Sequence, residues 1–109
     1  MTIELERALS SPEKAYDYAI YVTEKRFPEG EPVIAQDSRW AYYYARDVIN
    51  DRWPEAESVI AQDPEYAYLY ARDVIEGRFP EAEPLLARSE FGYRYARQFN
   101  LELKFVEKG

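Results

Sequence analysis

Apolar side chains in the middle of the chain recur at the spacing of one helical face. Between residues 41 and 49 they occupy positions i, i+3, i+4, i+7 and i+8, namely Ala41, Tyr44, Ala45, Val48 and Ile49. This spacing is typical of a helix that buries one side. A second, shorter apolar segment follows a proline, at residues 59–61. The pattern therefore predicts a helix of about a dozen residues and then a helix of about eight residues.

The two-helix pattern repeats every 26 residues. The motif RFPEGE at 26–31 returns as RWPEAE at 52–57 and as RFPEAE at 78–83. Between these motifs, AYDYA at 15–19 returns as AYYYA at 41–45 and as AYLYA at 67–71. A fixed period of this size is the signature of stacked repeats, in which each unit buries its apolar face against its neighbours. We therefore predict an all-α fold, a short α-solenoid of two-helix repeats with an N-terminal cap helix.

The period also predicts where each unit begins and ends within a single domain that covers residues 1–109. Residues 1–11 form the cap helix, and the repeats cover residues 12–37, 38–63 and 64–89. Residues 90–100 follow the same pattern with one residue deleted, and they form a closing helix. This organisation amounts to about eight helices. Residues 101–109 leave the pattern, and their alternation fits either a short strand or a tail that seals the last unit.

Local signals mark the helix ends in each unit. Asp63 precedes Pro64, which is the usual order of a capping oxygen and a first-turn proline. Gly77 follows the helix of the third unit, where a left-handed residue is expected. The aromatic residue before each RxPExE proline is placed to pack on the second helix as a hydrophobic staple; these residues are Phe27, Trp53 and Phe79.

The combination of ARDVI at 45–49 and 71–75 with RWPEAE at 52–57 resembles tyrosine-rich tandem helical repeats of bacteriophage and large-virus proteins. The resemblance covers roughly residues 12–97, and the first unit departs from it because Ile20 and Tyr21 replace Arg and Asp. It implies a viral setting, and hence the host cytoplasm. It implies no activity and no functional residues.

Composition excludes several classes of function. The chain has a net charge of −7, which argues against direct binding to a nucleic-acid backbone. It contains no Cys and no His, and so lacks the commonest nucleophile, general base and metal ligands. We therefore expect no enzymatic activity, no cofactor and no metal. No apolar run is long enough to span a membrane and no signal peptide opens the chain, so we expect a cytoplasmic protein.

Most of the repeated polar residues have a structural interpretation. The glutamates of each RxPExE motif stand at a helix N-terminus, and the two members of a pair point about 200° apart, so they do not converge on one atom. They are Glu29, Glu31, Glu55, Glu57, Glu81 and Glu83. The arginines before the aromatic residues and after the Tyr-Ala motifs are expected to pair with neighbouring acids. The tyrosine columns are expected to pack in the core with their hydroxyls at its rim.

Two columns of the first helix vary between units and therefore predict a solvent-exposed ridge. Asp17, Tyr43, Leu69 and Arg94 occupy the position between the two tyrosines, and Lys14, Trp40, Tyr66 and Phe91 stand one turn earlier. In α-solenoids such a ridge is the usual surface for partners. The predicted partner-binding residues are Trp40, Tyr43, Tyr66, Leu69, Asp17 and Arg94.

We therefore expect a non-enzymatic module that binds another protein, of the host or of a phage, along the ridge of first helices. The alternative is an acidic mimic of a nucleic acid, which inhibits a host defence or DNA-binding protein through the six glutamates named above. Self-association through the apolar ends of the stack is a further possibility.

Overall fold

Side-chain caps start the first helix of each of the three repeats, as the sequence predicted. These helices are α2 (Pro12–Tyr18), α4 (Ser38–Tyr44) and α6 (Pro64–Tyr70). The closing helix α8 (Phe91–Gln98) begins without a side-chain bond from its N-cap residue. Ser11 Oγ accepts the Lys14 N–H at 3.1 Å, and Asp37 Oδ1 accepts the Trp40 N–H at 3.1 Å. Each bond satisfies one of the backbone donors that a helix N-terminus leaves open.

The first helices of the three repeats end in a wider, π-helical turn. These turns are η1 (Ala19–Thr23), η2 (Ala45–Ile49) and η3 (Ala71–Ile75). A left-handed residue follows each turn: Glu24, Asn50 and Glu76, with φ between 54° and 59°. The prediction that Gly77 takes this conformation is wrong, because Glu76 takes it one residue earlier. The π-helical turn η3 explains why Glu76 is the left-handed residue, because this turn ends the helix at Ile75.

The second helices are shorter. They are α3 (Glu31–Ile34), α5 (Pro54–Ile60) and α7 (Glu83–Leu86), which follows the 3₁₀ turn η4 (Pro80–Ala82); α1 (Ile3–Ala8) stands in the same relation to α2. The aromatic residues Phe27, Trp53 and Phe79, which the sequence predicted as staples, are buried in the core. Each ring packs against the second tyrosine of its own unit, as Trp53 does against Tyr44 with centroids 4.9 Å apart.

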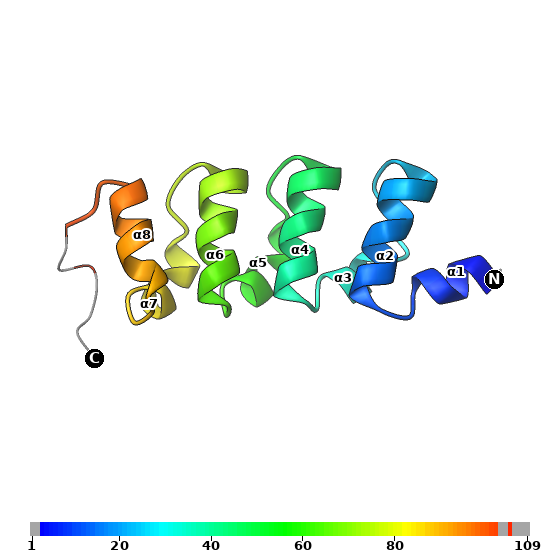
Figure 1. The fold of residues 1–109 in the computed structure, drawn as a ribbon, viewed down its shortest axis with the longest axis horizontal. Helices are drawn as coiled ribbons and strands as arrows, with labels where there is room; N and C mark the ends of the chain where they lie inside the picture. Colours follow the sequence, from blue (N-terminus) through cyan, green and yellow to red (C-terminus); the bar gives the residue numbers. More distant parts are fainter. Residues whose placement is uncertain (1–2, 103–104, 106–109) are drawn as a thin grey trace.

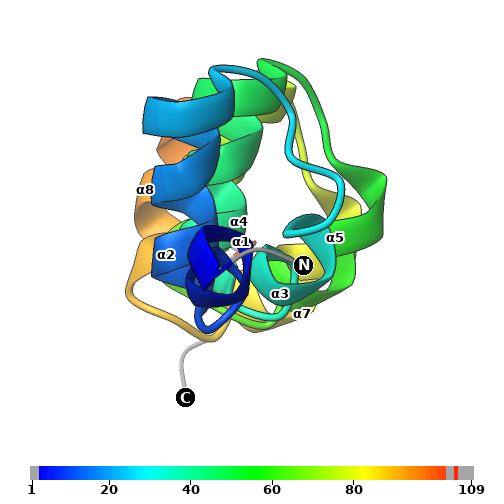
Figure 2. The ribbon, with the colours of Figure 1, turned by 90° about the vertical axis from the view of Figure 1, so that its right-hand side faces the viewer.

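The computed structural model describes residues 3–102 and 105, and within this part it contains the eight predicted helices and no strand. Figure 1 shows α2, α4, α6 and α8 side by side in one row, and Figure 2 shows the second helices in a layer along the other side. The extents are 53 × 23 × 17 Å, so the units form an elongated stack. The fold is the predicted all-α solenoid.

The core runs the length of the stack between the two layers. Its small members are alanines with no exposed surface, among them Ala15, Ala41 and Ala67 on the first helices. Because an alanine adds little volume, neighbouring helices approach closely there, and aromatic rings fill the remaining space at native density.

Beyond α8 the chain packs back onto the last unit. Leu101 N–H donates to the Ala96 carbonyl at 2.7 Å, and Phe105 stacks on Tyr95 with centroids 5.4 Å apart. Leu101, Glu102 and Phe105 form no strand, and both apolar side chains lie against the core, as a sealing tail would. The other tail residues, 103–104 and 106–109, lie outside the described residues.

Within the described part of the chain, none of the helices has both the length and the apolar character needed to cross a membrane.

Candidate functional site

The four apolar residues predicted to bind a partner lie together on two adjacent first helices. Trp40 and Tyr43 come from α4, and their ring centroids are 5.3 Å apart in an edge-to-face arrangement. Tyr43 also meets Tyr66 of α6 edge to face, at 6.2 Å. Leu69 follows Tyr66 by one turn on the same helix. Edge-to-face contact between the helices holds these rings in a fixed arrangement.

The ridge is less exposed than the sequence predicted. Trp40, Tyr43, Tyr66 and Leu69 are all half-buried and pack against the core, whereas Asp17 and Arg94 at the two ends of the row are exposed. We interpreted the variation in this column as freedom from packing, and for Tyr43 that interpretation is wrong. Its ring fills the space between two helices, so the column varies at positions that pack on neighbouring units.

Aromatic contacts continue the ridge toward both ends of the stack. Tyr16 of α2 lies 5.3 Å from Trp40 by ring centroids, and Tyr68 of α6 stacks on Phe91 of α8 at 6.4 Å. Together with the four predicted residues these rings form a strip along the row of first helices. We call it the aromatic strip; it consists of Leu69 and the aromatic residues Tyr16, Trp40, Tyr43, Tyr66, Tyr68 and Phe91.

Arginines cover part of the strip. The Arg46 guanidinium lies 5.1 Å from the ring centroids of both Tyr42 and Tyr43. Arg94 lies 5.7 Å from the centroid of Phe91. Such cation–π contacts place a positive charge on an otherwise apolar surface. The spacing of Arg46 from Tyr42 and Tyr43, four and three residues, is the sequence signal that reveals this contact.

The first tyrosine of the first two motifs joins its unit to the next one. Tyr16 donates from its hydroxyl to Asp47 Oδ2 at 2.6 Å, and Tyr42 donates in the same way to Asp73. Each aspartate is also held by the arginine before it, as Asp47 is by Arg46 at 2.7 Å. The aspartate of the ARD motif thus accepts a hydrogen bond from the tyrosine hydroxyl of the preceding unit.

The second tyrosine of the later units, at positions 44, 70 and 95, closes a buried network with the preceding unit. The Tyr70 hydroxyl donates to Glu57 Oε2 at 2.7 Å and accepts the backbone N–H of Trp53 at 2.7 Å. Glu57 in turn forms two hydrogen bonds with Arg52, at 2.8 and 2.9 Å. Tyr44 with Glu31, and Tyr95 with Glu83, repeat this arrangement. A bidentate pair, in which one guanidinium donates two hydrogen bonds to one carboxylate, is the strong form of an arginine–carboxylate ion pair.

These contacts explain most of the repeated charges. Arg26, Arg52 and Arg78 pair with Glu31, Glu57 and Glu83, which confirms the structural interpretation of those residues. The other glutamate of each motif is exposed: Glu29, Glu55 and Glu81. Of the six glutamates in the alternative acidic surface, three are therefore neutralised by arginine, and three remain available to a basic partner.

Both sides of the network have shifted pKa values. Hydrogen bonding to Arg52 is the main cause that lowers the pKa of the Glu57 carboxyl, and the Tyr70 hydroxyl lowers it further. Burial, followed by the hydrogen bond to Glu83, raises the pKa of Tyr95 to about 12. The pKa values of Tyr44 and Tyr70 are raised too, first by burial. Each network is therefore built from an ionised carboxylate and a neutral phenol.

We expect the free energy of unfolding to fall at both extremes of pH. The unfolded chain binds more protons than the native one near the ordinary carboxyl pKa of 4.5, so stability falls as pH drops below that value. A neutral tyrosine is favoured in the native state, so stability also falls as pH rises from 10 toward 12. Urea titrations at intervals across this range measure both losses.

A Tyr95→Phe variant is the control for the alkaline side. It is expected to lose less stability than the unaltered chain between pH 10 and pH 12, because it lacks one of the raised phenols. Equal losses in the two proteins would mean that this network does not cause the alkaline transition.

Among residues 3–102 and 105, no group of three or more carboxylates is placed to hold a metal ion. No protein-family model, curated protein or solved structure matches the chain. The fold by itself therefore defines the class of the protein: it is an α-solenoid of two-helix repeats, joined by tyrosine hydroxyls from unit to unit.

Proposed function

We propose that this chain is a non-enzymatic protein-interaction module that binds a partner protein along its row of first helices. The observation that supports the proposal is the aromatic strip, which crosses neighbouring helices and is partly exposed at every member except Tyr68. Tyr and Trp are enriched at the energetic centres of protein interfaces. In the proposed complex Trp40, Tyr43, Tyr66 and Leu69 supply the apolar contact, and Asp17 and Arg94 flank it.

Other features favour an interaction module over an enzyme. The whole chain lacks Cys and His, and the most regular carboxylates, Glu31, Glu57 and Glu83, are held by arginine and tyrosine. A carboxylate that already bonds these groups is a poor general base. The resemblance of the repeat to viral ones supports a phage-encoded protein that acts in the host cytoplasm.

The double variant Trp40→Ala, Leu69→Ala tests the ridge. It removes apolar contacts at the centre of the strip, so it is expected to lose the partner that the unaltered chain captures from a bacterial lysate. Capture is measured at about 50 and about 500 mM salt, because an apolar interface survives a screening that weakens a charged one. Bound proteins are identified by mass spectrometry.

Leu85→Ala is the matched control, since Leu85 is an exposed leucine on the second-helix layer. Circular dichroism must show that both variants keep their helices. Capture of the same partner by the folded double variant would rule out the ridge.

The acidic mimic remains the second candidate, because Glu29, Glu55 and Glu81 are exposed and stand one period apart. It predicts capture at about 50 mM salt that is lost at about 500 mM. Substitution of these three glutamates by Gln is then expected to abolish binding, whereas the Trp40→Ala, Leu69→Ala variant still binds.

A further inference from the structure

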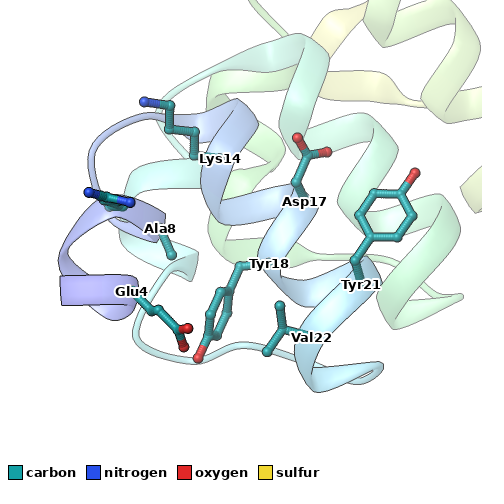
Figure 3. A pocket seen from close by; sticks show the side chains of 8 residues that line it. Glu4, Ala8, Lys14, Asp17, Tyr18, Tyr21 and Val22 are labelled. Atoms are coloured by element: carbon teal, nitrogen blue, oxygen red, sulfur yellow. The ribbon is translucent and has the colours of Figure 1, made fainter. Parts of the chain in front are cut away.

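The N-terminal end of the stack carries an open groove of about 580 Å³. It lies between α1 and the first helix of the first repeat, and Figure 3 shows the side chains that line it. Glu4, Arg7 and Ala8 come from α1, and Lys14, Asp17, Tyr18, Tyr21 and Val22 come from α2 and η1. We call it the N-terminal groove.

The repeat period identifies what this groove is shaped to hold. Its residues from α2 and η1 are one period before Trp40, Tyr43, Tyr44, Asp47 and Val48. At the next interface, Trp40 and Tyr43 pack against Tyr16, and Asp47 accepts its hydroxyl at 2.6 Å. The same positions in the first repeat face the groove. The groove therefore corresponds to the surface against which the first helix of a preceding unit would pack.

The groove exposes apolar side chains, unlike the outer face of a typical terminal unit. Tyr21 stands where the later units have Asp47 and Asp73, and its side chain is 77% exposed. Val22 beside it is 58% exposed. Terminal units of solenoids usually carry a polar outer face. A change from aspartate to exposed tyrosine at the outer face is instead typical of a surface that a partner covers.

The opposite end of the stack exposes the matching half. Tyr93 of α8 occupies the position of Tyr42 and Tyr68, which are 2% and 8% exposed, yet Tyr93 is 54% exposed. The described tail leaves it open. Phe105 stacks on Tyr95 at 5.4 Å, the distance at which Phe79 lies from Tyr70, so Phe105 takes the place of the staple on the second-helix side.

Charge is compatible with contact between the two ends. Residues 91–98 of α8 contain Arg94 and Arg97 and no acidic residue. The groove carries two acids, Glu4 and Asp17, beside Arg7 and Lys14, so it has no net charge, although the whole chain carries −7. The acids are thus available to the arginines of α8, and the general repulsion between two acidic chains is weakest at this end.

We propose that α8 of one copy docks in the N-terminal groove of a second copy, so that the solenoid continues head to tail. At the N-terminal end α1 has no first helix before it, and at the C-terminal end α8 has no second helix after it. In this contact α8 of one copy takes the first position and α1 of the next copy takes the second. In the register of the internal interfaces, Tyr93 meets Lys14, Asp17 and Tyr21 of the next copy. This inference does not rest on the ridge function proposed above, although Asp17 and Arg94 take part in both.

A head-to-tail contact of this kind does not close on itself, so it generates open chains. Light scattering is expected to give a mass that keeps rising beyond the dimer as the concentration increases from micromolar to millimolar. A mass that stays at 12.9 kDa throughout would overturn the proposal, and so would a mass that stops at the dimer.

Two variants test the pairing of unlike ends. Tyr21→Lys blocks only the groove, because it adds a positive charge to the surface that α8, with Arg94 and Arg97, approaches. Tyr93→Glu blocks only α8. Both side chains are largely exposed, so the fold is expected to persist. Each variant alone is expected to be a monomer. An equimolar mixture is expected to form a dimer and nothing larger, because one intact groove meets one intact α8.

Dimerisation of the Tyr93→Glu variant alone would show that two grooves meet each other, and it would overturn the head-to-tail contact. A mixture that stays monomeric would overturn it as well. Leu85→Glu changes an exposed leucine of α7 that belongs to neither the groove nor α8, and it is expected to assemble like the unaltered chain. Val22→Arg serves as a second groove variant if circular dichroism shows that Tyr21→Lys has lost helix.

Discussion

Replacing Trp53 by alanine is expected to lower the free energy of unfolding by about 3–5 kcal/mol, the cost of removing a large buried aromatic side chain. Trp53 is only 2% exposed and fills the space between α4 and α5 in the middle unit. Its ring lies 4.9 Å from that of Tyr44 by centroids. Each unit is stabilised only by its neighbours, so a cavity here weakens the connection between the two halves of the stack.

Urea denaturation followed by circular dichroism measures the loss. Tyr21→Ala is the matched control, because it also removes an aromatic ring but from a side chain that is 77% exposed; it is expected to change stability by no more than about 0.5 kcal/mol. A loss below about 1 kcal/mol for Trp53→Ala would contradict the central role of this ring in the core.

The second large effect is expected from Tyr70→Phe, which removes one oxygen atom. The hydroxyl is the partner of both Glu57 Oε2 and the buried Trp53 N–H. Without it, a buried donor has no acceptor and the carboxylate loses one of its donors. The expected loss is about 1–3 kcal/mol, the usual cost of leaving buried polar groups unpaired.

Tyr93→Phe is the control for this variant, since its hydroxyl belongs to an exposed tyrosine in the corresponding type of helix. We expect no measurable change in the stability of the monomer. Combining Tyr70→Phe with Glu57→Gln gives a double-mutant cycle. Strictly additive losses would show that the hydroxyl and the carboxylate do not act as one unit.

The helix starts and the arginine–glutamate pairs could be predicted from the sequence because both are local. Asp37 caps a helix that begins at the next residue, and Arg52 reaches a carboxylate five residues away in its own unit. Such contacts depend on spacing along one segment, which the sequence displays directly.

Gly77 shows where local reasoning failed. Glycine is the usual left-handed residue past a helix end, yet the non-glycine Glu76 adopts φ 57°. The end of the helix is set by the wider turn of η3, and that turn is not visible in the spacing of apolar residues. The partial burial of Tyr43 was missed because one of its neighbours lies on another helix. Its ring meets Trp40 on its own helix and Tyr66 on the next one, and the second contact depends on how the two helices pack.

The sequence by itself determined the period, the two-helix unit, the capped helix starts and the side of each helix that is buried. Only the tertiary structure showed that Tyr16 reaches Asp47, that Tyr70 reaches back to Glu57 and Trp53, and that Tyr21 and Tyr93 are exposed at opposite ends of the stack. The physical reason is distance. Helix formation and capping are decided within about one turn, whereas these hydroxyl bonds join residues of different units, whose partners depend on how one unit rests on the next.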